Sequence, residues 1–546
     1  MKKLKLFIVC SIIHLGYSLN SQTVQWANSY YHSAGVLSNA GLGLTTDAVG
    51  NAYNVGIFNG QTNFGTYTLS SQNTDIFITK TNSSGTVKWA KKFGNVNDEY
   101  SQAITADASS NVYIAGSFTG TVVFDTYTLT AAAPTTAYVF VCKMDSLGTV
   151  LWANGYLAIG SNTLTNICYD GTNNIYLTGS FDNQINFGST TINSTSSTYD
   201  AFVTKINNNG NVIWAKSFGG TLTDLSKSIA TDNSGNVYIT GEFSGMASFQ
   251  TYSVTSNGAK DAFVSKISSS GTVLWAKNYG GSSNDAGGSV TSNNSSNIYI
   301  GGNYTAPFTI GASTYTTNGA YLAKIDNSGN IIWSNNFETT SLVKISSMTT
   351  DLVGNVYSSG PFVGTTSFGT STVSAASLTS YSNFQPDIYI SKLDGGGNYA
   401  WVKHITIPGG SSDGTSVAYS SGSVYNTGYI GNVYGTIDTY TLIANSGFGY
   451  LIKIGAGGVG IHELSKETEI SIYPNPTQDK FSIFCKEEIK GGVEINVINA
   501  LGQKLISQKY TNLKNETIDL TNLSTGIYFF QLNIEGQRFT KKIVKE

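Results

Sequence analysis

Short runs of alternating apolar and polar residues, separated by Gly-, Ser- and Asn-rich turns, extend along most of the chain. In residues 228–281 these runs are SIAT, NVYITGEF, DAFVSKI and TVLWAKNY. Alternation with a period of two, bounded by turn residues, predicts a β-strand for each run. The segment between the second and third runs, MASFQTYSVTS, predicts an additional hairpin. This part of the chain is therefore expected to be a four-strand unit with an outer extension.

The unit recurs along the chain, because three series of residues keep the same register. Trp residues lie 58 to 68 positions apart, each Tyr of a second series precedes a Gly by three positions, and each Lys of a third precedes a Gly by five. The series are Trp26, Trp89, Trp152, Trp214, Trp275, Trp333 and Trp401; Tyr53, Tyr113, Tyr176, Tyr238, Tyr299, Tyr357 and Tyr425; and Lys80, Lys143, Lys205, Lys266, Lys324, Lys392 and Lys453. A repeat of four short strands predicts a β-propeller.

The two ends of the repeat array complement each other. Lys453 has no Trp nine residues after it, whereas Trp26 has no Lys nine residues before it. The strand around Trp26 is thus expected to complete the last unit, which would remove two exposed sheet edges. The predicted fold is all-β: a seven-bladed β-propeller closed by N- and C-terminal strands in one blade, followed by a small C-terminal β-sandwich.

The repeats resemble the beta-propeller repeat often called SBBP. Its pattern is matched by DNSGNVYITG (232–241), DAFVTK (200–205), DAFVSK (261–266) and FGGTLTD (218–224), and similar segments extend from about residue 24 to 458. GAYLAK (319–324) and FGYLIK (448–453) depart from the pattern, because they lack its Asp. The resemblance implies a β-propeller over residues 22–458.

Composition and charge narrow the class of protein. Only 12% of the residues are charged, the net charge is -3, and Arg538 is the one arginine, so nucleic-acid binding is excluded in practice. Residues 1–21 have a basic start and an apolar stretch from Leu6 to Leu15, which predict a signal peptide. No other segment is long and apolar enough to predict a transmembrane helix. The mature chain is expected to be a monomer.

Charge density rises after the Gly-rich segment near residue 458. Residues 459–469 are expected to be a linker, and short alternating strands follow over 470–546. This tail resembles the C-terminal type A sorting domain of the type nine secretion system of Bacteroidetes, through YPNP (473–476), NALGQKL (499–505), LSTGIYFFQL (523–532) and a Lys-rich final strand. The resemblance implies recognition by the secretion machinery and a secreted or cell-surface protein. The residues that carry it are Tyr473, Pro474, Asn475, Pro476, Gly502, Gly526, Tyr528, Lys541 and Lys542.

No catalytic or zinc motif is present. His residues show no metal-ligand spacing, and there is no Gly-x-Ser-x-Gly elbow, so we expect neither a zinc site nor a Ser-His-Asp triad. The repeated Trp residues are interpreted as packing anchors, and the repeated Lys residues as packed stems with solvated ends. Asp75, Asp200, Asp261 and Asp387 begin the third strand of their repeats and are interpreted as structural.

The connections between successive repeats are the candidate ligand site. In propellers such loops gather on one face around the central channel. They contribute five acidic residues, Asp98, Glu99, Asp224, Asp285 and Asp413, whose oxygen atoms suit sugar hydroxyls or a hard cation. The alternative interpretation is that each Asp caps its own turn. We expect no cofactor, since calcium is chemically conceivable here but no calcium-binding motif supports it.

The sequence thus predicts a non-enzymatic propeller that binds an extracellular glycan or protein through its loop face. The alternative is an exported polysaccharide-degrading enzyme, a glycosidase or lyase, whose carboxylate pair would come from the same loops. Asp98–Glu99 is the one adjacent acidic pair in those loops. A third possibility, a structural spacer or adhesin, has the same sequence signature as the binding protein.

Overall fold

The computed structural model describes residues 22–32, 40–95, 97–132, 137–293, 297–375, 386–407, 412–431, 434–443, 448–455, 470–499, 504–534 and 537–546. Those residues form strands and turns, and among them there is no helix able to cross a bilayer. The chain divides into a compact unit of residues 21–456 and a second that contains residues 457–546. The predicted signal peptide (1–21) and linker (459–469) lie outside the described residues, so these boundaries stay predictions.

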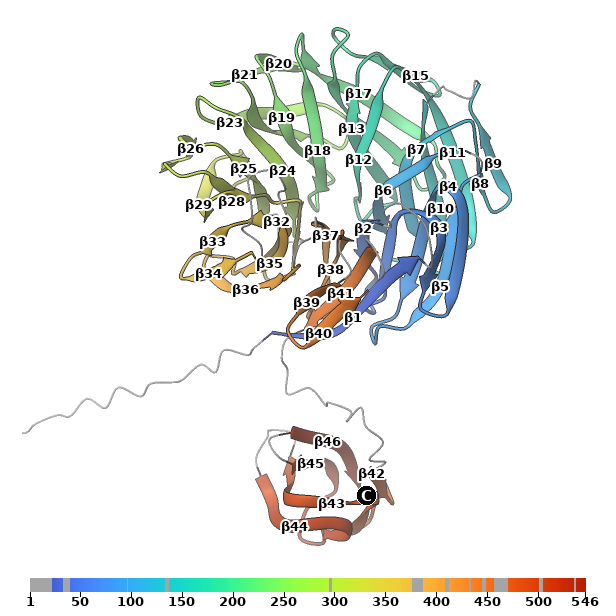
Figure 1. Cartoon of the computed structure of the whole chain (residues 1–546), viewed down its shortest axis with the longest axis vertical. Helices are drawn as coiled ribbons and strands as arrows, with labels where there is room; N and C mark the ends of the chain where they lie inside the picture. The colour runs from blue at the N-terminus through green and yellow to red at the C-terminus, as the bar shows by residue number, and fades with distance from the viewer. Residues whose placement is uncertain are drawn as a thin grey trace, which may run out of the picture. The chain divides into compact units, whose positions relative to one another are not determined.

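The larger unit is a β-propeller whose blades are antiparallel four-strand sheets arranged around a common centre (Figure 1). Within a blade the strands follow chain order from the centre outward, except that β1 is the outermost strand beside β41. Each blade is named below by its innermost strand. The innermost strands are β2 (Ala40–Thr46), β6 (Glu99–Ala106), β12 (Asn162–Tyr169), β18 (Asp224–Thr231), β24 (Asp285–Ser292), β31 (Ser347–Thr350), which is preceded by the short β30 (Leu342–Val343), and β37 (Ser412–Ser420).

The middle strands of the blades carry the repeated Tyr and the repeated Lys. The second strands are β3 (Ala52–Phe64), β7 (Val112–Thr119), β13 (Asn174–Phe181), β19 (Val237–Phe243), β25 (Ile298–Tyr304), β32 (Val356–Val363) and β38 (Ser423–Ile430). The third strands are β4 (Tyr67–Thr81), β10 (Ala137–Met144), β16 (Asp200–Asn207), β22 (Asp261–Ile267), β28 (Gly319–Ile325), β35 (Asp387–Leu393) and β41 (Phe448–Gly455). Both sets are buried, because the apolar clusters lie between the faces of successive blades.

The outermost strands carry the repeated Trp. They are β5 (Val87–Phe93), β11 (Val150–Ile159), β17 (Val212–Gly220), β23 (Val273–Tyr279), β29 (Ile331–Thr339), β36 (Tyr399–Ile405) and β1 (Thr23–His32). The first strand of the chain, β1, pairs with β41, from Thr23 opposite Gly455 to Tyr30 opposite Gly449. The strand around Trp26, which has no preceding Lys strand in the sequence, therefore lies beside the last repeat.

Hairpins between the second and third strands connect neighbouring blades. They are β8–β9 (Thr121–Phe124, Tyr127–Thr130), β14–β15 (Gln184–Phe187, Thr190–Asn193), β20–β21 (Met246–Phe249, Tyr252–Thr255), β26–β27 (Phe308–Ile310, Ser313–Tyr315), β33–β34 (Thr365–Phe368, Ser371–Ser374) and β39–β40 (Tyr434–Ile437, Tyr440–Ile443). Strands β14, β20 and β33 pair with β11, β17 and β29, the outer strands of the preceding blades. The predicted extra hairpin is therefore present and extends the neighbouring sheet.

The repeated Tyr, Lys and Trp residues form one contact within each blade and one between blades. Each Lys ammonium lies 5.0–5.7 Å from the ring centre of the Tyr in the same blade, a cation–π distance. The indole N–H of Trp214 donates to the carbonyl of Ser269 in the next blade at 3.1 Å. Trp26 makes the same bond to Ser83 at 3.0 Å. The fixed spacing of the series thus reflects contacts that recur at successive blade junctions.

The Asp of the DxxGN turn joins the inner two strands. Oδ1 of Asp232 accepts the amides of Ser234 and Asn236, and Oδ2 accepts the hydroxyl of Tyr238 at 3.2 Å. The ammonium of Lys266 lies 3.5 Å from the same Oδ2, and both charged side chains are buried. Several buried donors therefore share one carboxylate, and two of them, the Tyr238 hydroxyl and the Lys266 ammonium, also bond to Oδ1 of Asn327.

Replacing Asp232 by Ala is expected to lower the free energy of unfolding by about 2 to 3 kcal/mol, because buried donors lose their acceptor. The matched control is Asp326→Ala, in which a more exposed Asp of the same type of turn accepts the amides of Ser328 and Asn330. The Asp326→Ala substitution should lower the free energy of unfolding by about 1 kcal/mol or less. Urea denaturation of both variants measures the difference, and equal losses would contradict the expectation.

The C-terminal unit contains β42 (Ile470–Tyr473), β43 (Lys480–Asn499), β44 (Lys504–Asp519), β45 (Gly526–Ile534) and β46 (Gln537–Lys545). They form one hydrogen-bonded sheet, in the order β42-β43-β45-β46, with β44 also paired to β43. The two separate sheets of the expected sandwich are joined, because β43 is 20 residues long and its pairing with β44 has several bulges. Bulges let one strand continue from one packing layer into another.

Candidate binding site in the central channel

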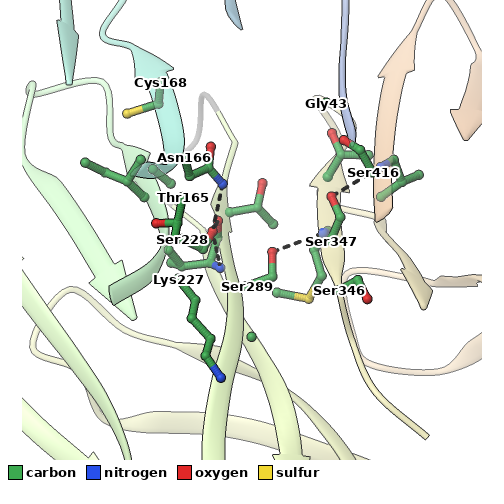
Figure 2. A pocket seen from close by; sticks show the side chains of 18 of the residues that line it. Gly43, Thr165, Asn166, Cys168, Lys227, Ser228, Ser289, Ser346, Ser347 and Ser416 are labelled. Atoms are coloured by element: carbon green, nitrogen blue, oxygen red, sulfur yellow. Dashed lines mark hydrogen bonds between the residues drawn. The ribbon is translucent and has the colours of Figure 1, made fainter. Parts of the chain in front are cut away.

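The innermost strands surround a cavity of about 660 Å³. Residues of all the innermost strands line it, and most of the polar lining groups are hydroxyls and amides (Figure 2). Lys227 and Lys344 are the charged residues among its described lining, which contains no Asp or Glu. The described channel wall is therefore polar, with ammonium groups as its only formal charges.

A β-bulge recurs at the same position of the innermost strands. The register shifts between Gly41 and Gly43, Ser101 and Ala103, Leu164 and Asn166, Ser226 and Ser228, Gly287 and Ser289, and Asp413 and Ser416. In the β31 blade the innermost strand is instead interrupted between β30 and β31. An inserted residue leaves the ladder and changes the direction of nearby side chains. Leu42, Thr165, Lys227, Gly288 and Thr415 are such residues and line the cavity.

The repeated Gly of the second strand makes room for each bulge. A methyl group on Gly241 would lie 1.8 Å from the carbonyl oxygen of Leu225, because the bulge pushes that carbonyl toward the second strand. The equivalent contacts at Gly116, Gly179, Gly302, Gly360 and Gly428 are 1.9 to 2.1 Å. The repeated Gly is thus a condition for the bulges that shape the channel.

Hydroxyl groups after the bulges connect neighbouring innermost strands. Ser228, Ser289 and Ser347 accept backbone amides of the next innermost strand at 3.0 to 3.2 Å. At the opposite ends of the strands, Thr231 donates to the carbonyl of Tyr169 at 3.1 Å. Hydrogen bonds between neighbouring innermost strands therefore connect the channel wall from blade to blade.

One end of the channel has a charged mouth. The ammonium of Lys227 lies 2.5 Å from Oε2 of Glu242, and that of Lys260 lies 2.9 Å from Oε1 of the same carboxylate. Burial opposes ionisation of Glu242, but the two ammonium groups lower its pKa. Figure 2 shows the Lys227 side chain extending away from the hydroxyls of the wall. At the β37 blade, Asp413 is exposed and faces the Ser346 hydroxyl at 3.4 Å.

The structure separates the five acidic residues predicted for the site. Glu99, Asp224 and Asp285 have at most 1% of their surface exposed. Asp98 and Asp413 are exposed, and Asp98 accepts the amide of Thr74 at 3.0 Å. Ligand binding by these five residues stays a prediction, but Glu99, Asp224 and Asp285 are buried and not accessible to a ligand in solution.

The position of each acidic residue in its strand ladder explains why some of them are buried and others exposed. Glu99, Asp224 and Asp285 are the first residues of their strands, opposite Phe118, Phe243 and Tyr304. In the β37 blade the equivalent residue is Ser412, opposite Ile430, and Asp413 is one residue further on. A shift of one residue turns a side chain to the other face of a strand.

Sequence reasoning missed Tyr100, Lys227 and Lys344. Tyr100 follows Glu99 and is 46% exposed, at the position that Asp413 occupies in the β37 blade. These side chains differ from blade to blade, whereas the packing positions repeat. The residues beside each bulge differ from one repeat to the next, and this variation could have identified them as site residues. The sequence does not show where the bulges lie, however.

The sorting-tail residues are placed as follows. Tyr473 is exposed, and Oδ1 of Asn475, between Pro474 and Pro476, accepts the amide of Val544 at 2.9 Å. Tyr528 is buried near Gly526 at the start of β45, and its hydroxyl donates to the Ser524 carbonyl. Lys541 and Lys542 belong to β46, and Gly502 lies outside the described residues.

Lys545 is an additional anchor in the tail that sequence reasoning missed. Its buried ammonium donates to the carbonyls of Leu520 and Leu523 at 2.7 and 2.8 Å. It also lies 3.2 Å from a carboxylate oxygen of Asp479. The final strand is therefore held at its last residues.

Two observations concern metal ligands and thiols in the described part of the chain. No group of three or more His, Cys, Asp and Glu side chains there is arranged to hold a metal ion. Cys168 lines the cavity, and burial raises the pKa of its thiol far above the ordinary value. A thiol with a raised pKa is a poor nucleophile.

Comparison with known families finds a match within each of the two parts of the chain. Residues 213–242 match the SBBP beta-propeller repeat, and residues 471–546 match the secretion system C-terminal sorting domain. The chain therefore contains SBBP repeats and a type nine sorting domain, as the resemblances implied. The sorting domain indicates export to the cell surface or beyond.

Similarity to individual proteins is more distant. An uncharacterized WD repeat-containing protein of Acanthamoeba polyphaga mimivirus is 25% identical over 366 residues, 54% of this chain and 26% of that protein. The chain thus spans about a quarter of the curated relative that it matches. Sqt1 from Chaetomium thermophilum has a TM-score of 0.37 at 9% identity, over 78% of this chain and 88% of that one. A puromycin hydrolase mutant complexed with PGG has a TM-score of 0.40 at 7% identity, over 82% and 58%.

Proposed function

We propose that this protein is an exported, non-enzymatic β-propeller that binds a glycan or a protein at the mouth of its central channel. The observation that carries the proposal is the contrast between repeated and variable positions. Packing residues recur in register, whereas the side chains beside the bulges change from Leu42 to Thr165, Lys227 and Gly288. Variation confined to a concave polar surface is typical of a ligand site on a rigid scaffold.

The proposed propeller has seven blades and is closed by the two ends of its chain. Bonds between the β37 and β2 blades support this, because they repeat those between successive blades. The Thr46 hydroxyl donates to the Tyr419 carbonyl at 3.2 Å, as Thr231 does to Tyr169. Tyr425 donates to the Gly50 carbonyl at 2.9 Å, the same contact that Tyr299 makes at another junction.

The chemistry of the mouth suits sugar or peptide recognition. Tyr100 offers an exposed aromatic face, and the Lys227–Glu242 pair offers both a donor and an acceptor. Aromatic side chains supply much of the contact area at binding sites, and charged pairs orient the ligand through directional hydrogen bonds. The proposed binding requires no cofactor.

The acidic residues also support binding rather than glycoside cleavage. A glycosidase needs two carboxyl groups that flank the bond in an accessible cleft. Of the adjacent acidic pair, Glu99 is fully buried and Asp98 bonds to the backbone of Thr74. We therefore assign no catalytic residue.

The test is binding of purified chain 22–546 to a mixed array of glycans and extracellular proteins, with a parallel assay for glycan cleavage. For a ligand found in this way, Tyr100→Ala is expected to weaken affinity about tenfold, equal to about 1.4 kcal/mol. The matched control is Tyr252→Ala, which removes a 39% exposed Tyr from the outer hairpin strand β21 and should change affinity less than about twofold.

Two results would overturn the proposal. Cleavage of an array glycan would make the protein an enzyme and direct attention back to Asp98 and Glu99. Equal effects of the Tyr100 and Tyr252 substitutions on affinity would place the ligand away from the channel mouth.

A further inference from the structure

Pairs of buried carboxyl groups face each other where certain blades meet. Asp200 begins β16 in the β12 blade, and Asp224 begins β18 in the next blade; each is 1% exposed. A methyl group on Gly219 would lie 2.5 Å from Oδ1 of Asp200 and 2.8 Å from Oδ2 of Asp224. The two carboxyl groups therefore border the same small volume.

Each carboxyl group of this pair has one oxygen with a partner and one without. Oδ2 of Asp200 accepts the amide and the hydroxyl of Thr195, both at 2.8 Å. Oδ2 of Asp224 accepts the Gly220 amide at 2.7 Å. Both Oδ1 atoms are buried and have no hydrogen-bond partner among the described residues. Buried polar atoms are rarely left unpaired, so Oδ1 of Asp200, which borders the same volume as Oδ2 of Asp224, needs a further donor.

A similar pair lies at one more junction. Asp75 and Glu99 lie on either side of Gly94, with Oδ1 of Asp75 and Oε1 of Glu99 unpaired within the described part of the chain. A third junction differs. Asp261 lies against Gly280 and raises the pKa of Asp285 after the larger effect of burial, but the two carboxylate oxygens of Asp285 already accept the amides of Gly281 and Thr305. The other junctions that the structure describes lack the second acid, as at Asp387, where the residue in register is Ser412.

Two ionised carboxylates buried face to face would repel each other without solvent to screen them. Between Asp200 and Asp224 no described Lys, Arg or His contributes a compensating charge. One shared proton removes the repulsion and gives Oδ1 of Asp200 a partner, because a protonated Asp224 carboxyl can donate to that oxygen. We propose that the pairs Asp200–Asp224 and Asp75–Glu99 each hold a shared proton, so that two blade junctions form a pH-sensitive device that loosens when the proton is lost.

Burial first, and the neighbouring carboxyl in addition, raise the pKa of Asp224 to about 7, of Glu99 to about 8 and of Asp285 to about 6. The other charged groups that face the pairs differ between junctions. Asp75 forms an ion pair with Lys92, and Asp98 adds a further negative charge near Glu99. Next to Asp285, the Lys260 ammonium is already held by Glu242. The Asp200–Asp224 junction has no such neighbour among the described residues and is the best one to test.

The direction of the pH effect follows from these shifts. A raised carboxyl pKa means that the folded chain binds protons that the unfolded chain has already released. Stability is therefore greatest below the unfolded pKa and falls as pH rises toward the folded pKa. For Asp224 the loss extends from about pH 4 to about pH 7, and for Glu99 it continues to about pH 8.

The experiment measures thermal unfolding of chain 22–546 between about pH 5 and about pH 9, with wild type, Asp224→Asn and the control Glu338→Gln, which changes an exposed carboxyl group of β29. The wild-type Tm is expected to fall by several degrees over this range. The side-chain amide introduced by Asp224→Asn would supply a permanent donor to Asp200, so this variant should have a higher Tm at high pH and a flatter pH dependence. Glu338→Gln should follow the wild-type curve.

An independent readout is the infrared carbonyl band of a protonated carboxylic acid at neutral pH, which should weaken in Asp224→Asn. Parallel Tm curves for wild type and Asp224→Asn, or a band of unchanged strength, would overturn the proposal. So would a rise in wild-type Tm on addition of calcium at high pH that Asp224→Asn does not show, because the pair would then hold a cation.

Discussion

A chain that begins at residue 40 is expected to lose much of the stability of the propeller, because it lacks β1. Strand β1 covers the edge of β41 and buries Tyr30 against Phe64 and Phe77, at ring-centre distances of 5.0 and 6.3 Å. Burial of Tyr30 and Val24 alone is worth about 4 kcal/mol. The lost ladder bonds and the exposed strand edge add to that. Thermal and urea unfolding of chains 40–546 and 22–546 measure the effect.

Complementation and truncation provide the controls. A peptide of residues 22–32 should bind the shortened chain and restore its Tm, whereas the same peptide with Tyr30→Asp should not. Removal of residues 457–546 should leave the unfolding of the propeller unchanged, because they form a separate compact unit. An unaltered Tm in the chain that begins at residue 40 would contradict the role of β1 and, with it, the proposed closure.

Gly241→Ala is expected to destabilise the propeller by more than about 3 kcal/mol, the upper range for an overpacked core. The added methyl group would lie 1.8 Å from the Leu225 carbonyl oxygen, a backbone atom that cannot rotate away. The β18 bulge, which places Lys227 at the channel, would have to shift. Both a lower Tm and weaker binding of a channel ligand are therefore expected from one substitution.

Gly155→Ala in β11 is the matched control. Its methyl group would meet the ring of Phe118 at 3.4 Å, an ordinary contact distance. Gly155→Ala should leave the free energy of unfolding within about 0.5 kcal/mol of the wild-type value. Equal effects of the two substitutions on the free energy of unfolding would show that the bulge does not require Gly241.

The repeat pattern was sufficient to predict the strands and much of their packing. The runs around Tyr238, Lys266 and Trp275 became the second, third and fourth strands of one blade, because alternation and turn residues act locally. The extra hairpin was also expected. The sandwich prediction for the tail missed the continuity of its sheet, because bulges along β43 leave no mark on the apolar pattern.

The candidate site was predicted less well. The loop acids were grouped by their spacing, but the spacing does not specify which face of a strand each one occupies. Asp224 lies in the interior and Asp413 lies outside, because they are one position apart in the ladder. Tyr100 and Lys227 were overlooked for a related reason: a bulge changes the alternation locally, and the sequence does not mark where it occurs.

By itself, the sequence determined the all-β architecture, the repeat and the sorting tail, since each is set by residues close together along the chain. Only the tertiary structure decided which side chains line the channel and which acids face each other. Asp200 meets Asp224, and Thr231 meets Tyr169, across the junction between two blades. Such neighbours depend on the register and twist of separate sheets, so their burial and charge follow from the assembled propeller and not from any single repeat.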